Sequence, residues 1–189
     1  MCSALPPRIR LLGKSVFYFG LIFFALDLIS AQLKPLQQEP LFIEWLALAQ
    51  APWLGLVTGL VFTALVQSSS VTSGVAILLA QQGALPVEAA IPIVVGANVG
   101  STSTALLASL GMGAVARATA FANALFNGIG AVLYFPFLAA FSHAMVSIAS
   151  DPGLAVASAH LVFNLSISLA FLVAMPWFEP WLRRRLLSV

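Results

Sequence analysis

The sequence predicts an all-α, polytopic helical membrane protein with a re-entrant hairpin and a broken span. Of its 189 residues, 61% are hydrophobic and only 7% are charged, whereas a soluble domain carries about 25% charged residues. So few charged side chains cannot cover a soluble domain, and most of the outer surface must therefore face lipid. Long apolar runs predict the spans, and shorter apolar segments separated by polar residues predict the hairpin and the broken span.

Three stretches reach the length of about 20 apolar residues that a spanning helix needs. They are residues 16–33, 118–137 and 155–176. The first is closed by Lys34-Pro35, and the third is followed by Trp177 and Trp181, which are typical of the membrane–water interface. Residues 41–50 form a short, more polar segment that we expect to lie along the interface.

Four apolar segments between residues 53 and 116 are each too short to span a membrane alone. They cover residues 53–66, 71–80, 86–97 and 104–116. A Gln-Ser-Ser-Ser run separates the first two, and Asn98 to Ser103 separate the last two. Interrupted helices of this kind are tolerated inside a membrane where they line a polar cavity, and they point to a transporter's binding site. We expect a hairpin at about 53–82 and a broken span at about 86–116; the alternative is two ordinary surface loops.

Basic residues gather at both ends of the chain. Seven of the eight lysines and arginines fall on one side of this topology, and only Lys34 falls on the other. Since basic flanks mark the cytoplasmic side, we expect three parts in a cell-membrane protein. They are a basic cytoplasmic N-terminus (1–14), a single transmembrane repeat (15–182) and a basic cytoplasmic C-terminus (183–189). The basic ends are too short for nucleic-acid binding, and the single cysteine, Cys2, excludes an internal disulfide.

The densest polar cluster lies at the first break. It consists of Gln67, Ser68, Ser69, Ser70 and Thr72. If residues 71–80 form a half-helix, its unpaired N–H groups carry about +0.5 of an elementary charge and favour an anion such as phosphate. The unpaired carbonyls at the end of the preceding half-helix would suit a sodium ion.

The second break repeats this pattern with Asn98, Ser101 and Thr102. Neither break contains a Lys or Arg, so a buried phosphate would need co-bound cations, and oxygen ligands suit sodium. The expected sodium ligands are Gln67, Ser68, Asn98, Ser101 and Thr102. Sodium would be a co-transported ion, and no cofactor is expected. Close helix packing is the other explanation for small residues in membrane helices.

Four sequence elements resemble the type II sodium–phosphate cotransporter family. They are Thr-Ala-Leu-Val-Gln-Ser-Ser-Ser-Val-Thr (63–72), Gly-Ala-Asn-Val-Gly-Ser-Thr (96–102), Ala-Asn-Ala-Leu-Phe-Asn (122–127) and Ala-His-Leu-Val-Phe-Asn (159–164). The resemblance implies an inverted repeat that binds phosphate and sodium where two Gln-Ser-Ser-Ser hairpins meet. Only one such element is present here, so the chain resembles one half, and the second would come from the same parent chain or from a partner subunit. Val71 and Asn123 depart from the Ala and His common in the family.

Other residues and functions are weaker candidates. We expect Asn127 and Asn164 to fasten helices or broken backbone, with direct ligand binding as the alternative. Asp27 and His160 are further polar residues inside apolar stretches. The chain is expected not to be an enzyme, since an intramembrane hydrolase using Ser68–Ser70 and His160 would lack the Gly-x-Ser-x-Gly turn. Transport of another oxyanion and a non-transporting subunit remain alternatives.

Overall fold

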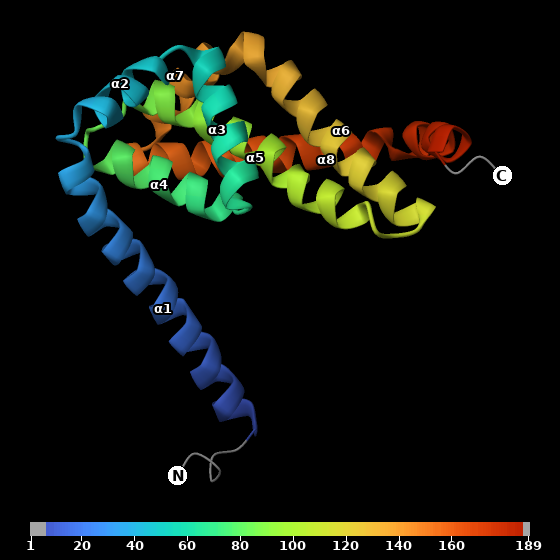
Figure 1. Ribbon diagram of the computed structural model, residues 1–189, viewed down its shortest axis with the longest axis horizontal. Coiled ribbons are helices and arrows are strands. Elements are labelled where there is room, and N and C mark those ends of the chain that lie inside the picture. Colours follow the sequence, from blue (N-terminus) through green and yellow to red (C-terminus); the bar gives the residue numbers. More distant parts are fainter. Residues whose placement is uncertain (1–6, 187–189) are drawn as a thin grey trace.

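The computed structural model describes residues 7–186, and within them the side chains of 12–185 apart from that of Leu182. All regular structure in this range is helical (Figure 1), which confirms the all-α prediction. Four helices are long and apolar enough to cross a membrane, or five if the bent pair α2–α3 counts as one span. The elements are α1 (Pro7–Leu36), α2 (Pro40–Leu48), α3 (Pro52–Val66), α4 (Ser69–Gln81), α5 (Val87–Ser109), α6 (Ala114–Tyr134), the 3-10 helix η1 (Phe135–Phe137), α7 (Leu138–Ile148) and α8 (Pro152–Leu186).

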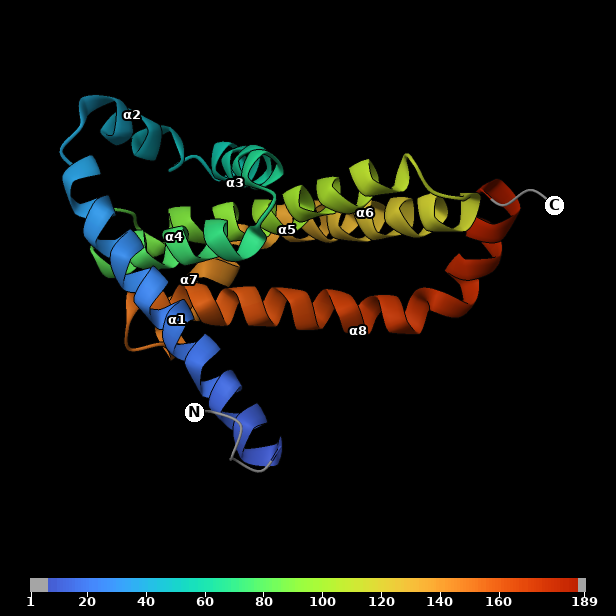
Figure 2. The same cartoon turned by 60° about the horizontal axis from the view of Figure 1, so that its bottom comes forward.

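Helix α5 is the centre of the bundle. Its Ala90, Ile91, Val94 and Val95 are at most 1% exposed, and α3, α4, α6, α7 and α8 all contact it. In Figure 2, α8 runs along the length of the bundle and α6 lies beside the C-terminal half of α5, while α3 and α4 lie toward the other half. The core therefore lies around the helix that carries the second polar run of the sequence.

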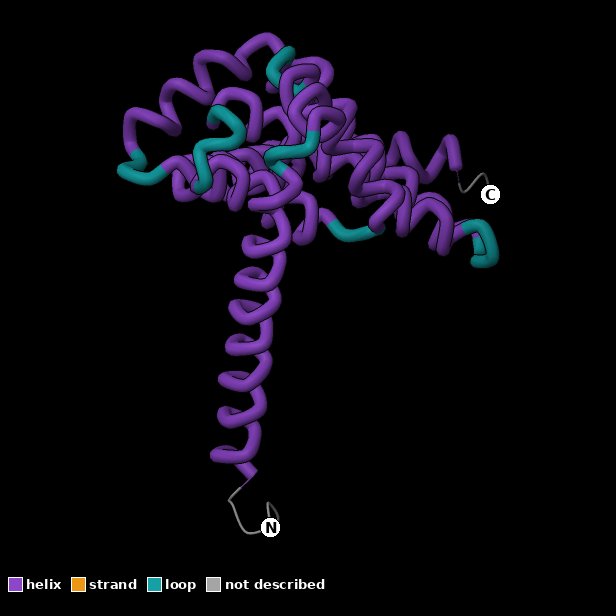
Figure 3. Tube along the Cα trace, turned by 60° about the vertical axis from the view of Figure 1, so that its left-hand side comes forward, coloured by secondary structure: helices purple, strands orange, loops and turns teal. Residues whose placement is uncertain are grey.

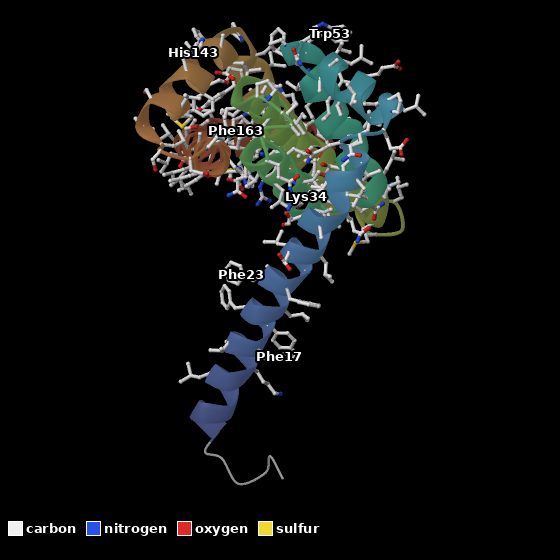
Figure 4. The ribbon with its side chains drawn as sticks, turned by 90° about the vertical axis from the view of Figure 1, so that its left-hand side faces the viewer. Phe17, Phe23, Lys34, Trp53, His143 and Phe163 are labelled. Carbon is white, nitrogen blue, oxygen red and sulfur yellow. The ribbon has the colours of Figure 1, made fainter. Side chains whose placement is uncertain are left out.

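Helix α1 stands away from this bundle (Figure 3). Its Phe17 and Phe23 project freely (Figure 4) and are 65% and 68% exposed. A polar cluster fastens its C-terminal end, because Gln82 Nε2 donates to Ser30 Oγ at 2.8 Å and Gln37 Nε2 donates to Gln82 Oε1. An apolar helix exposed on all sides is suited to lipid rather than to water.

The predicted break at Asn98–Ser103 is wrong, because α5 continues through it to Ser109. The polar side chains bond to their own helix instead of interrupting it. Asn98 Nδ2 donates to the Val94 carbonyl at 3.0 Å, and the hydroxyls of Ser101 and Thr102 each donate to a carbonyl three residues back at 2.7 Å. Such bonds satisfy the side chains locally, so the chain turns only at residues 110–113.

Glycines bring α3 and α5 into backbone contact. A Cβ on Gly59 would lie 1.9 Å from the Ile93 carbonyl oxygen, and one on Gly96 would lie 1.9 Å from that of Leu56. Gly55 and Gly100 make the same kind of contact near the two ends of the crossing. Each helix thus carries a Gly-xxx-Gly pair, the arrangement that lets membrane helices approach most closely. The α5 glycines serve packing rather than a break.

Candidate functional site

The Gln-Ser-Ser-Ser run forms the turn between α3 and α4, as the hairpin prediction required. Gln67 has φ 58° and ψ 27°, the left-handed conformation that ends many helices and that few residues other than glycine adopt. Its N–H donates to the Thr63 carbonyl at 2.7 Å. Gln67 is therefore the single residue of this turn with a left-handed backbone, and the chain direction changes sharply there.

Helix α4 begins immediately after this turn with Ser68 as its N-cap. The Ser68 hydroxyl accepts from the Val71 N–H at a long 3.4 Å, and the Ser68 carbonyl accepts from the Thr72 N–H at 3.2 Å. The first N–H groups of a helix have no intrahelical acceptor, so those of Ser69 and Ser70 point out of the α4 end. The same rule leaves the last carbonyls of α3 beside them, at Ala64 to Val66. Donors and acceptors therefore meet at one tip.

Two buried threonines join the arms of the hairpin. Thr63 Oγ1 on α3 donates to Thr72 Oγ1 on α4 at 2.6 Å, and Thr72 Oγ1 is also 3.3 Å from the Ser68 carbonyl, to which it donates. Both side chains are at most 3% exposed. Ser68 and Ser69 are half-buried, whereas Gln67 and Ser70 are exposed. The tip thus has a buried side, formed by Thr63 and Thr72, and an open side, formed by Gln67 and Ser70.

The tip reaches beyond the middle of α5. Near the base, Gly55 lies against Ala89 and Pro92, and near the tip Thr63 lies against Gly100. At the other end of the hairpin, Gln81 of α4 touches Gly153 at the start of α8. The two short helices therefore enter beside one end of α5 and return to that end, which is the geometry of a re-entrant hairpin.

The residues expected from the second break do not face this tip. A helix turns by about 100° per residue, so Asn98 lies about 200° around α5 from Gly96, and Thr102 about 200° from Gly100. Since the glycines face α3, Asn98 and Thr102 point to the opposite side, where both are buried. The expected arrangement of two half-helix ends facing each other is therefore absent from the described residues.

Sequence reasoning missed three hydroxyls that the structure singles out. The Oγ atoms of Ser73, Ser103 and Ser142 are buried and have no hydrogen-bond partner among the described residues. Ser73 follows Thr72 on α4, and Ser103 lies only about 60° around α5 from Gly100, on the side that contacts α3. Buried hydroxyls are normally paired. The helical spacing of Ser103 from Gly100 was the signal that could have identified it.

Asn127 and Asn164 line a cavity of about 240 Å³ between α6 and α8. Each amide donates to the carbonyl four residues back in its own helix, at 3.0 and 2.8 Å, rather than across the interface. The direct polar link between these two helices is instead the 2.5 Å hydrogen bond between Tyr134 and Ser166. The predicted fastening role stays a prediction, and the two asparagines join Asn123 and Ser168 around a polar cavity.

Comparison with known proteins places this architecture in context. Residues 32–150 match the family described as Na+/Pi-cotransporter. The Bacillus subtilis protein YqeW is 32% identical over 87% of this chain, and the human sodium-dependent phosphate transport protein 2B is 34% identical over 52% of it. A protein of Escherichia coli named for inorganic phosphate export, YjbB, is 27% identical over 91% of the chain.

The chain spans only part of the length of these relatives. The matched region is 54% of YqeW, 31% of YjbB and 15% of transport protein 2B. No solved structure matches the chain.

Proposed function

Because the chain belongs to the Na+/Pi-cotransporter family, a family of transporters and not of enzymes, we propose that it takes part in sodium-coupled transport of inorganic phosphate. Its membrane-length helices make it a multi-pass membrane protein. The proposed location is the cell membrane, with both termini on the cytoplasmic side.

The observation that carries this proposal is the hairpin tip. It gathers helix N–H groups, hydroxyls and an amide near the middle of the central helix, inside a stretch from residue 45 to 87 without a single Lys, Arg, Asp or Glu. A cluster of neutral donors suits an anion that has to be released again. We propose that Gln67, Ser68, Ser69, Ser70 and Thr72 contact the phosphate.

The lack of a fixed positive charge supports coupling to sodium. An anion buried without a partner costs several kcal/mol, and bound sodium ions would neutralise it. The carbonyls at the end of α3, with Gln67 and Ser68, offer oxygen ligands beside the α4 N-terminus. Asn98, Ser101 and Thr102 face another side of α5, so their contribution to substrate or sodium would belong to a separate surface of this helix.

A second half is part of the proposal. The open side of the tip exposes Gln67 and Ser70, so a further surface is needed to enclose a ligand there. The chain spans about half the length of YqeW, which fits one half of a two-part transporter. The second half would come from the same parent chain or from a partner subunit.

Phosphate binding and uptake test this function separately. Radiolabelled phosphate binding to the purified protein should require sodium and fail with choline. Ser68→Ala and Ser69→Ala should each weaken it by about 1.5–3 kcal/mol, the range for a hydrogen bond to a charged group. Binding that is indifferent to sodium would contradict the coupling, and stronger binding of sulfate would assign another oxyanion. Sodium-driven uptake into vesicles by this chain alone would remove the need for a second half.

A further inference from the structure

A groove of about 470 Å³ lies where α5 turns into α6. Its walls are mostly aliphatic and aromatic, and several of these side chains remain open to the outside. Leu107, Leu110 and Phe121 are 56%, 74% and 44% exposed. The groove is remote in sequence from the hairpin tip, and none of the residues proposed to bind phosphate lines it. Its lining includes Leu106, Leu107, Ser109, Leu110, Arg117 and Phe121.

Arg117 provides a single positive charge in this apolar groove. It is exposed, and it forms no ion pair with an acidic residue in the described part of the chain. The nearest acidic residues in sequence are Glu88 and Asp151, both at the other ends of long helices. A guanidinium is always charged and presents its donors in a fork that matches a phosphate group. The groove therefore combines an unpaired cation with apolar walls.

The groove lies at the basic end of the molecule. In Figures 1 and 2, the α5–α6 turn lies at the same end of the molecule as the C-terminal part of α8. The junction between α1 and α2 lies at the opposite end. Ring contacts of Phe126 on α6 with Phe171 and Phe178 on α8 tie these regions together. The last turns of α8 carry Trp181 and the exposed Arg183, Arg184 and Arg185. Aromatic and basic residues together are typical of the membrane–water interface on the cytoplasmic side.

From this arrangement we infer that the groove binds one anionic phospholipid. Its headgroup phosphate is held by Arg117, and an acyl chain lies against Leu106, Leu107, Leu110 and Phe121. The charge selects an anionic headgroup, and the exposed aliphatic side chains replace contacts with neighbouring lipid tails. The site is independent of the proposed transport site.

A lipid phosphate fits this groove better than free inorganic phosphate. A dianion bound at Arg117 alone would leave most of its oxygens against leucine and phenylalanine, which offer no donors. A lipid headgroup would place its remaining oxygens in the water of the interface, and its tail would cover the apolar walls. Basic residues near a membrane surface each add about 1 kcal/mol to the attraction for anionic lipid.

Native mass spectrometry of the full chain in detergent, titrated with phosphatidylglycerol or phosphatidylcholine, tests this inference. The wild-type protein should retain one phosphatidylglycerol in preference to phosphatidylcholine. Arg117→Gln should weaken its binding roughly fivefold, while Arg184→Gln, which removes an exposed arginine of the same end outside the groove, should leave the affinity unchanged. Ala114→Trp keeps Arg117 but fills the groove, and it should reduce binding of both lipids.

Equal phosphatidylglycerol affinity in Arg117→Gln and wild type would overturn the inference. An equal loss of phosphatidylglycerol affinity in Arg117→Gln and Arg184→Gln would also overturn it, because the lipid would then be attracted by the overall positive charge and not by one site. Displacement of the retained lipid by millimolar inorganic phosphate would assign the arginine to free phosphate instead. The experiment measures retained lipid, so its result is informative whether or not the chain transports phosphate.

Discussion

Gln67 combines an uncommon backbone conformation with a side chain at the open side of the hairpin tip. A residue other than glycine in the left-handed region costs about 1–2 kcal/mol. The amide of Gln67 lies on the exposed side of the tip, which is why we propose it as a phosphate contact. Backbone strain and side-chain function can be separated at this position by substitution.

We predict that Gln67→Gly keeps or raises the thermal unfolding temperature in detergent, because it relieves the left-handed strain. Sodium-dependent phosphate binding by the same variant should fall. Gln67→Val serves as the comparison, since a β-branched residue resists this conformation and should lower the unfolding temperature. Undiminished phosphate binding in Gln67→Gly would remove the amide from the site.

The buried pair Thr63–Thr72 makes a second prediction at this scale. Thr72→Val removes the acceptor of the Thr63 hydroxyl, so it should lower the free energy of unfolding by about 1–3 kcal/mol. Thr63→Val should cost less, because Thr72 still donates to the Ser68 carbonyl. The double variant should cost less than the sum of the two. Strictly additive losses in denaturant unfolding would mean that the two hydroxyls do not interact.

At the scale of elements, the crossing of α3 and α5 depends on the absence of side chains. Methyl groups at Gly59 or Gly96 would overlap backbone carbonyl groups, which cannot rotate away as a side chain can. The hairpin is therefore held at its position along α5 by backbone contact, and the depth of the Gln-Ser-Ser-Ser tip follows from it.

We predict that Gly59→Ala and Gly96→Ala each lower the unfolding temperature strongly and reduce the yield of folded protein. Gly128→Ala is the matched control, because it also lies inside a helix but its Cβ would have nothing within 4 Å. Alanine is favoured over glycine in helices by about 1 kcal/mol, so the control should be neutral or stabilised. Size-exclusion profiles and thermal unfolding measure both effects.

The sequence was most informative about elements and least informative about interruptions. The segments on both sides of Gln67 predicted α3 and α4 to within two residues. The long apolar runs located α1 and α8 but missed residues 7–15 of α1 and 177–186 of α8, and α7 was not predicted. Asn98 to Ser103 looked like a break because small polar residues occur both in loops and in helices. Deciding between a loop and a helix required the structure. It shows that the Ser101 and Thr102 hydroxyls donate to carbonyls three residues earlier in α5, and that Gly96 and Gly100 contact α3. The inward direction of Ser73 depends on tertiary packing, so the sequence pattern could not predict it, whereas Ser103 could have been identified from its helical spacing to Gly100.

For the whole molecule, charge and architecture agree along one axis. The α5–α6 turn, which precedes Arg117, and the C-terminal part of α8, which carries Arg183 to Arg185, lie at one end of the bundle (Figure 1). Helix α1 joins α2 at the other end, and Lys34 lies in the last turn of α1. This separation is what a single membrane orientation requires. It also argues against an antiparallel pair of identical chains, which would need insertion in both directions.

Single cysteines in a Cys2→Ser background test this orientation. Gly113→Cys lies in the α5–α6 turn at the basic end, and Ser150→Cys lies in the exposed α7–α8 turn. A membrane-impermeant thiol reagent should label the first only from the cytoplasmic side and the second only from the other side. Labelling of both positions from both sides would mean dual insertion and would make an antiparallel homodimer the source of the second half.

The glycine contacts between α3 and α5 also constrain how such a protein can move. Backbone carbonyl groups of one helix occupy the space that a side chain would fill at Gly59 and Gly96 of the other. The hairpin therefore cannot slide along α5 or tilt away from it without separating the two backbones. The hairpin and α5 are therefore expected to move together as one rigid unit. We predict that alternation of access in the proposed transporter occurs outside this unit, for example at the asparagine-lined cavity between α6 and α8. The residues proposed to bind the ligands would then move together with α5.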